Sequence, residues 1–185
     1  NDFVAVRLYA HQVSSTRQPG ERTDFTETLF WHAGIRTGKK GTATIEFGLN
    51  DAVSSFRVLA DAFTAGGVLG SKTRQIDSVE PFYLEPKLPL EVTMDDLIHA
   101  PIGVVNATSA PLSGTDIRIS GNAGQAFSGV ITPFDMAPGE RTRRMMRVRV
   151  GQFSGQADFT LSATAGPYGD QVTRAVAVRP LGFPV

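Results

Sequence analysis

The feature that most constrains this chain is an alternation of apolar and polar residues with a period of two. From residue 42 to residue 49, every second residue is apolar, and the intervening residues are Thr, Thr, Glu and Gly. Successive side chains of a β-strand point to opposite faces, so this spacing predicts a half-buried strand. No stretch of ten or more residues has the period of an amphipathic helix. The sequence therefore predicts an all-β fold.

Strand-like runs fall into two groups, separated by turn pairs such as Pro19-Gly20 and Gly66-Gly67. The first group has five predicted strands, at residues 3–10, 25–31, 42–49, 53–63 and 73–79. The pattern resets at Glu80-Pro81, and seven more strands are predicted at residues 82–94, 98–108, 115–120, 126–131, 142–150, 157–163 and 171–178. Seven strands over about 100 residues are typical of an immunoglobulin-like or fibronectin-like antiparallel β-sandwich. We expect residues 80–185 to form that sandwich. Residues 1–79 have too few strands, so we expect half of a domain or a smaller sheet packed on the sandwich.

Composition excludes several classes of function. Eighteen Lys and Arg balance eighteen Asp and Glu, so the chain lacks the excess positive charge that binds nucleic acid or an anionic membrane. The absence of Cys removes disulfides, thiolate nucleophiles and thiolate metal sites. No apolar run is long enough for a membrane helix, so we expect no membrane insertion. Because the chain begins at Asn1 and ends at Val185 directly after a strand-like run, we expect a piece of a longer protein.

Candidate chemical groups are few. His11, His32 and His99 are far apart and lack metal-ligand spacing, so structural roles are expected. Ser154 lies in a Gly-rich stretch that does not match a nucleophile elbow, and we predict a turn there. Asp95-Asp96 lacks the ligand spacing of a calcium loop and is also expected to form a turn. We therefore predict no catalytic, cofactor-binding or metal-binding residues, no cofactor and no enzymatic activity.

The densest run of charge contains five arginines. They are Arg141, Arg143, Arg144, Arg147 and Arg149. Alternation places four of them on the exposed face of a strand, opposite Met146, Val148 and Val150. Arg144 falls on the other face. Acids predominate between residues 80 and 139, so we hypothesise cross-strand ion pairs between the two segments. Convergence of the arginines on a pocket without acids would indicate an anion site instead. Asn106-Ala-Thr108 fits a glycosylation sequon, although the turn preference of Asn explains its position at a strand end.

Several strand-and-turn motifs resemble the alpha-2-macroglobulin family, particularly its bacterial members. They are Val-Ser-Ser-Phe-Arg-Val-Leu-Ala at 53–60, Gly-Val-Leu-Gly-Ser at 67–71, Glu-Pro-Phe-Tyr-Leu-Glu-Pro-Lys-Leu-Pro at 80–89, and Ile-Gly-Val-Val-Asn at 102–106. The resemblance implies macroglobulin-like domains, with residues 1–79 as the second half of a domain interrupted by a bait segment and residues 80–185 as the next complete one. It also implies a structural piece of a protease-trapping protein, located in the periplasm, cell envelope or outside the cell. Its partners would be neighbouring macroglobulin-like domains and, through the parent protein, proteases.

An alternative class is a cell-surface adhesion or carbohydrate-binding module, which would present an exposed aromatic platform. Tyr9, Phe30 and Trp31 could form one, but buried sheet positions are expected for them. The half-domain also makes a structural prediction. One apolar face of residues 1–79 should lack covering strands within this chain, namely the face with Ile45, Phe47, Phe56 and Val58.

Overall fold

A computed structural model describes residues 8–18, 20–121 and 128–182, and contains strands but no helix in these ranges. The strands are β1 (Leu8–Ala10), β2 (Glu21–Arg22), β3 (Phe30–His32), β4 (Ser55–Phe63), β5 (Leu69–Asp77), β6 (Phe82–Pro86), β7 (Glu91–Thr93), β8 (Leu97–Asn106), β9 (Leu112–Gly121), β10 (Ser128–Met136), β11 (Arg141–Arg149), β12 (Gly155–Ala165) and β13 (Tyr168–Arg179). The chain divides into two compact units. The first is formed by residues up to 19 and by 23–52, and the second by Gly20–Arg22 and everything from residue 53 onward.

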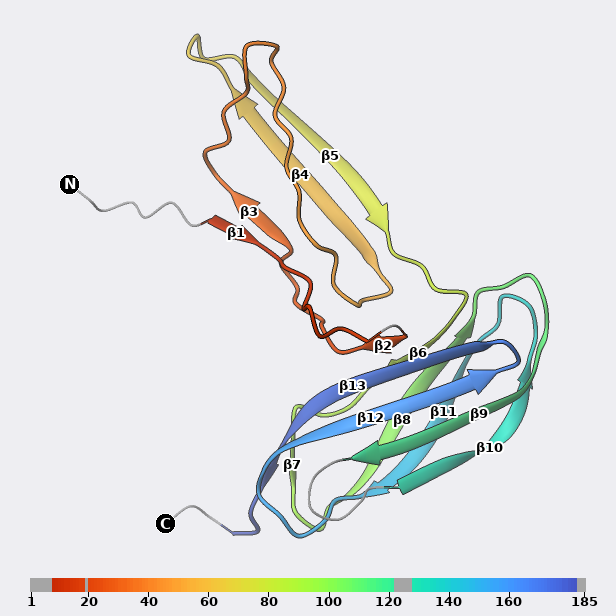
Figure 1. The fold of residues 1–185 in the computed structure, drawn as a ribbon. Coiled ribbons are helices and arrows are strands. Elements are labelled where there is room, and N and C mark those ends of the chain that lie inside the picture. Colours follow the sequence, from red (N-terminus) through yellow and green to blue (C-terminus); the bar gives the residue numbers. More distant parts are fainter. Residues whose placement is uncertain (1–7, 19, 122–127, 183–185) are drawn as a thin grey trace. The chain divides into compact units, whose positions relative to one another are not determined.

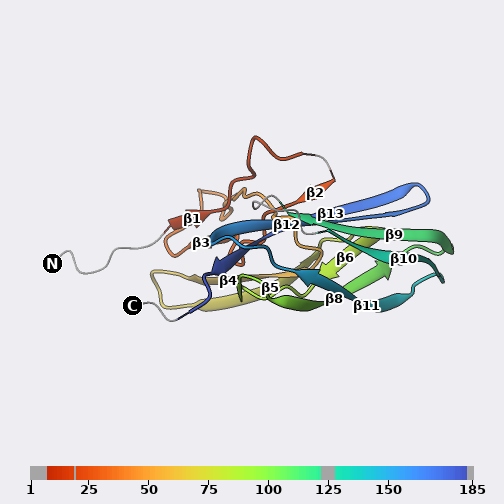
Figure 2. The ribbon, with the colours of Figure 1, turned by 90° about the horizontal axis from the view of Figure 1, so that it is seen from below.

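The second unit contains a two-layer antiparallel sandwich (Figures 1 and 2). One sheet has the order β11-β8-β6, and the other has the order β10-β9-β12-β13-β2, with β7 also paired to β13. Within the second sheet, β9, β12 and β13 pair antiparallel, whereas β2 and β7 run parallel to β13. Strands β6 to β13, here called the sandwich, correspond to the predicted β-sandwich. The all-β prediction is confirmed.

The sandwich core follows the alternation that the sequence predicts. On β12, every second residue from Ala157 to Ala165 is buried, and on β11 the buried residues are Met146 and Val148. These side chains lie on the inner faces of the two sheets, and the residues between them point outward. The arginine-rich outer face predicted for β11 is likewise confirmed.

Prolines explain how one predicted strand becomes two. Residues 82–94 form β6 and β7, which belong to different sheets, since β6 pairs with β8 and β7 pairs with β13. Pro86 ends β6, and Pro89 lies in the segment that crosses between the sheets. Proline cannot donate to a β-ladder, so it is found at strand ends and sheet edges. The short strand β2 was not predicted, because two residues are too few for a periodic pattern.

The first unit contains less regular structure than predicted. Its strands are β1 and β3, which pair antiparallel with Tyr9 opposite Trp31. The predicted strand at 42–49 is wrong, because these residues form no strand, and the strand predicted at 25–31 shrinks to β3. A strand needs a neighbouring ladder to satisfy its backbone groups, and alternation alone does not supply one. Of the strand predicted at 3–10, residues 3–7 lie outside the described residues.

Strands β4 and β5 form a nine-residue-by-nine-residue antiparallel hairpin, here called the hairpin. Every residue of β5 is exposed, and on β4 only Phe56 and Val58 are half-buried. The tip carries Phe63 and Leu69, each 80% exposed. Of the four residues predicted to form an uncovered apolar face, Ile45 is exposed, whereas Phe47, Phe56 and Val58 are half-buried. The most exposed apolar side chains of the hairpin lie at its tip instead.

The compact units and the sequence pattern divide the chain at different residues. The compact units separate at residues 52 and 53 and assign the hairpin to the second unit. The sequence places a domain boundary at residues 79 and 80, which would group the hairpin with the first unit. The boundary at 79 and 80 stays a prediction.

Candidate functional site

The most polar cluster of the first unit surrounds His11, which is 6% exposed. Its Nδ1 lies 3.0 Å from the carbonyl oxygen of Gly48, and its Nε2 contacts Oδ2 of Asp24. The other carboxylate oxygen of Asp24 accepts hydrogen bonds from the backbone N–H and the hydroxyl of Thr26. Both ring nitrogens of His11 are thus engaged with oxygen atoms inside the unit. A general base needs a nitrogen open toward a substrate, so this arrangement suits packing rather than catalysis.

A buried carboxylate, that of Asp51, joins three segments of the first unit. Oδ2 of Asp51 accepts the backbone N–H groups of Thr23 and Asp24, both at 2.9 Å, and its Oδ1 pairs with the guanidinium of Arg17 at 2.5 Å. Asp51 is 5% exposed. A buried charge requires such partners, which here hold the segment at residues 23–24 against residue 51. The cluster has a structural role, and no periodic pattern in the sequence could have predicted it.

The most buried ion pair of the second unit joins β2 to β13. Nε of Arg22 donates to Oδ1 of Asp170 at 2.8 Å, and Nη2 donates to Oδ2 at 2.5 Å. Nη2 also donates to the carbonyl oxygen of Leu84 at 2.7 Å, while the N–H of Leu84 donates to Oδ2 of Asp170 at 2.7 Å. Arg22 and Asp170 are each 8% exposed. Bidentate pairs of this kind fix geometry as well as charge.

The arginine face of β11 is partly paired with acids, as hypothesised. Nη1 of Arg141 lies 3.1 Å from Oε2 of Glu85, although β8 separates their strands. Gly103 of β8 lies opposite Glu85 and has no side chain, and a Cβ there would approach Cβ of Glu85 to 3.1 Å. Arg144 instead lies over the ring of Phe134, at 4.2 Å from the centroid. The other three arginines, Arg143, Arg147 and Arg149, are exposed.

Other sequence candidates have structural roles. Asn106 ends β8 with no exposed surface, its amide nitrogen donates to the carbonyls of Ala110 and Ala137, and its oxygen accepts from Thr108. It is therefore inaccessible for glycosylation in this fold. Asp95 lies in the predicted turn with φ of 65°, and Asp96 accepts the N–H of Thr93. Within the described ranges, no group of three or more His, Cys, Asp or Glu could hold a metal ion.

The remaining polar candidates do not come together. Ser154 lies in the loop before β12. His32 accepts the N–H of Gly34 and stacks on Phe30 in the first unit, whereas His99 belongs to β8 of the second unit. Among the described residues, no hydrogen bond or ring contact links the three histidines to one another.

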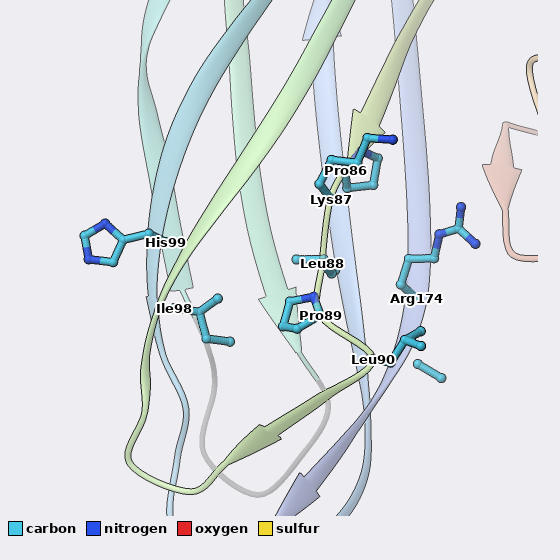
Figure 3. Close-up of a pocket in the computed structure, with 9 residues that line it drawn as sticks. Pro86, Lys87, Leu88, Pro89, Leu90, Ile98, His99 and Arg174 are labelled. Atoms are coloured by element: carbon cyan, nitrogen blue, oxygen red, sulfur yellow. The ribbon is translucent and has the colours of Figure 1, made fainter.

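The sandwich has a shallow groove of about 600 Å³, bordered by residues 86–90, β8 and β13 (Figure 3). Its floor is mostly apolar, and the basic residues along it are Lys87, His99 and Arg174, with no acid among the lining residues that the structure describes. Figure 3 shows His99 and Arg174 pointing to opposite sides of the groove. Burial and the nearby charge of Arg22 lower the pKa of Arg174. The arginines of β11 do not converge on this groove, so it is not the anion site considered for them.

Two aromatic residues that were predicted to be buried, Tyr9 and Trp31, are exposed. Trp31 is 57% exposed and Tyr9 is 40% exposed, although buried positions were expected for both. They oppose each other across β1 and β3, which places both side chains on one face of this two-stranded sheet. Phe30 faces the other way, is half-buried and stacks on Phe47 with centroids 5.5 Å apart. The prediction of burial was wrong for Tyr9 and Trp31, because only one face of this two-stranded sheet is covered.

No helix in the described residues is long and apolar enough to cross a membrane. No curated protein sequence matches the chain. Residues 28–116 match the model of the alpha-2-macroglobulin family. This range includes the hairpin and β6 to β8, where the sequence motifs lie.

Solved structures of bacterial alpha-2-macroglobulins have a similar fold. The Escherichia coli protein activated by porcine elastase matches with a TM-score of 0.65, at 18% identity over 85% of this chain and 14% of that one. The trypsin-activated Escherichia coli protein gives a TM-score of 0.64 at 20% identity, covering 82% and 11%. A Salmonella alpha-2-macroglobulin mutant gives 0.57 at 20% identity, covering 82% and 10%. This chain spans only about a tenth to a seventh of their length. Residues 28–116, just under half of the chain, are therefore similar to the alpha-2-macroglobulin family, and the all-β fold is similar to that of its bacterial members.

Proposed function

We propose that this chain is a structural region of a bacterial protease-trapping protein, without enzymatic activity of its own. Support comes from the family match at residues 28–116, together with the two Escherichia coli structures, which are described as activated by elastase and by trypsin. In this proposal a protease is a partner of the parent protein. The periplasm, the cell envelope or the exterior is the corresponding location.

The role of this region would be mechanical. The sandwich has a buried apolar core, whereas the hairpin is exposed over nearly its whole length. A packed domain can rotate or shift as one body, and an adjacent exposed segment can then form new contacts while the domain keeps its fold. We infer that residues 80–185 move as one body when the parent protein is cleaved, and that the hairpin completes its packing against neighbouring macroglobulin-like strands of the same polypeptide.

The test of protease trapping uses the full parent chain with trypsin and elastase as probes. A trapped protease keeps its activity on a small chromogenic peptide but loses activity on a large protein substrate. Small-angle scattering before and after cleavage would report the rearrangement. Equal loss of both activities would indicate a conventional active-site inhibitor, and loss of neither would contradict the proposal.

The proposed domain boundary can be tested on the 185-residue chain by limited proteolysis. A boundary at residues 79 and 80 predicts a resistant fragment that begins near residue 80. A resistant fragment that begins near residue 53 and keeps the hairpin would instead support the division into compact units. Mass spectrometry of the first stable fragment distinguishes the two.

The exposed pair of Tyr9 and Trp31 favours one second candidate, a carbohydrate-binding surface, because aromatic faces stack on sugar rings. Trp31 is the only Trp of the chain, so its fluorescence reports directly on this surface. Saturable quenching or enhancement by soluble oligosaccharides, lost in Tyr9→Ala, would support this candidate. Unchanged fluorescence across a panel of them would exclude it.

A further inference from the structure

Both ring nitrogens of His11 face hydrogen-bond acceptors. Nδ1 lies 3.0 Å from the carbonyl oxygen of Gly48, and Nε2 contacts a carboxylate oxygen of Asp24. Carbonyl and carboxylate oxygens accept hydrogen bonds and cannot donate them. A neutral imidazole carries a proton on one nitrogen only, so it would leave the lone pair of the other nitrogen against an oxygen. Only the doubly protonated ring, the imidazolium ion, satisfies both contacts.

The contacts of Asp24 indicate that its carboxyl group is ionised. Its Oδ1 accepts the backbone N–H of Thr26 at 3.1 Å and the hydroxyl of the same residue at 2.8 Å. Burial raises the pKa of Asp24, but these hydrogen bonds and the contact with His11 outweigh burial, so the pKa lies below the usual 3.8. At neutral pH the carboxyl group therefore has no proton to donate to the ring, and the two side chains form an ion pair.

One carboxylate balances the charge of the His11 ring, which is largely shielded from water because the residue is 6% exposed. Within the described residues, no charged group other than Asp24 forms a hydrogen bond or an ion pair with the ring. The carboxylate of Asp51, which accepts the N–H of Asp24, is already paired with Arg17. The acids on the two segments that contact His11 are otherwise exposed, namely Glu27 and Glu46.

His11 joins the end of β1 to two other segments of the first unit. Its backbone N–H donates to the carbonyl of Leu29 at 2.7 Å, and its carbonyl oxygen accepts the N–H of Gly48 at 3.1 Å. The ring adds a second link to Gly48 and a link to Asp24. Because the regular sheet here has only two strands, such links supply much of the cohesion of the unit. Loss of one ring proton would remove a hydrogen bond and the positive charge of the ion pair.

We propose that a proton held by His11 fastens the first unit, so that this unit loosens as the pH rises above neutrality. The ring is charged in the folded unit, whereas an unfolded histidine loses its proton at about pH 6.5. Above that pH, unfolding releases the proton, and the release favours the unfolded form increasingly as the pH rises. The stabilisation is therefore fully present below about pH 6.5 and is lost at higher pH. This proposal does not depend on protease trapping, because it rests on the contacts of one ring.

The first experiment measures the protonation of the histidine rings in the whole chain at neutral pH by nitrogen-15 nuclear magnetic resonance. Both ring nitrogens of His11 are expected to give the signal of a protonated nitrogen. His32 is the control within the same unit, because its Nδ1 accepts the N–H of Gly34 at 2.9 Å and must therefore be unprotonated. An unprotonated ring nitrogen at His11 would overturn the proposal, and this measurement requires no substitution of the pair.

The second experiment follows urea unfolding of the first unit in the whole chain between pH 6.5 and pH 8.5, through the fluorescence of Trp31, the only Trp. The equilibrium constant for unfolding should rise by up to about tenfold per pH unit, which corresponds to the release of one proton. His11→Gln should abolish this rise, because the amide does not titrate. His32→Gln is the matched control and should keep the rise, because the ring of His32 carries no such proton in the folded unit.

Two outcomes of the unfolding experiment would contradict the proposal. One is an unfolding constant of the unsubstituted chain that does not change with pH, because no proton would then be released. The other is the same rise in His11→Gln as in the unsubstituted chain, because a different group would then release the proton. If His11→Gln does not fold, the resonance measurement on the unsubstituted chain decides between the charged and the neutral ring.

Discussion

The two long hairpins of the chain are built alike and buried differently. Strands β4 and β5 have nine residues each, and β12 and β13 have eleven and twelve. Both pairs form regular antiparallel ladders. Yet β12 buries every second residue, whereas β5 buries none. The difference shows that pairing of two strands orders the backbone, while burial requires further layers.

The neighbours explain the contrast. Strand β12 has β9 on its other side and faces the second sheet, so its apolar face is covered. The sheet of β4 and β5 has two strands only. An isolated two-stranded hairpin is marginally stable in water, because it buries too little apolar area to offset the loss of chain entropy. The stability of the chain is therefore concentrated in the sandwich.

The largest expected effect contrasts two phenylalanines. Phe159 of β12 has no exposed surface, and Phe63 of β4 is 80% exposed. Phe159→Ala leaves a cavity and should lower the free energy of unfolding of the sandwich by about 3–5 kcal/mol. Phe63→Ala should change it by less than about 0.5 kcal/mol, as is usual for exposed positions. Urea unfolding followed by circular dichroism measures both. Similar losses would mean that the hairpin tip is packed in solution.

The same contrast explains which strands the sequence could predict. In β8, β9, β11, β12 and β13, alternation matched a real ladder, so each predicted strand corresponds to an observed one. In residues 42–49 an equally regular alternation gave no strand, because no strand in the described part of the chain pairs with this segment. Periodicity therefore reports the faces that a segment would have, and not whether a neighbour is present.

The candidate sites show a similar limit. Roles as turns could be predicted for Asp95 and Asp96 from local chemistry alone. The pair of Arg22 and Asp170 could not, since 148 residues separate its members and β2 is too short to carry a pattern. The exposure of Trp31 was also missed, because aromatic residues are buried only where a second layer exists.

Two glycines extend the comparison to the first unit. At Gly48, a Cβ would lie 2.6 Å from Cγ2 of Val13 and 3.3 Å from Nδ1 of His11, whereas at Gly70 of the hairpin it would meet nothing within 4 Å. Gly48→Ala should destabilise the first unit by about 1–3 kcal/mol through overpacking. Gly70→Ala should be neutral or stabilising by up to about 1 kcal/mol. The fluorescence of Trp31 follows unfolding of the first unit. A harmless Gly48→Ala would mean that residue 48 does not pack on His11.

The acid limb of the stability curve should differ between the two units. Burial raises the pKa of Asp24, but hydrogen bonds from Thr26 and the contact with His11 outweigh it, so the pKa lies below the usual 3.8. A depressed folded-state pKa adds stability that is present above 3.8 and is lost as pH falls through the folded value. Asp24→Asn should therefore destabilise the first unit at neutral pH, with a deficit that shrinks under acid.

Asp77 of the hairpin provides the control for that measurement. Hydrogen bonds from Ser55 and Gln75 lower its pKa too, although Asp77 is an exposed residue. Asp77→Asn should leave the acid unfolding of the first unit, followed by the fluorescence of Trp31, unchanged. A deficit of Asp24→Asn that grows as pH falls would contradict the assigned sign.

The smallest expected effects belong to the exposed ion pairs of the sandwich. Arg141 with Glu85 and Arg179 with Glu91 join segments of opposite charge, as the sequence led us to expect, but their side chains are 33–64% exposed. Water screens such pairs, so double-mutant cycles should give about 0–1 kcal/mol for each. The pair of Arg141 should lie at the upper end, because Arg141 also donates to the hydroxyl of Tyr83 at 3.2 Å. If the coupling energy were as large as that of the buried pair of Arg22 and Asp170, burial would not explain the difference in strength between exposed and buried ion pairs. A small coupling would mean that the buried apolar layers, and not these exposed charges, supply most of the stability of the sandwich.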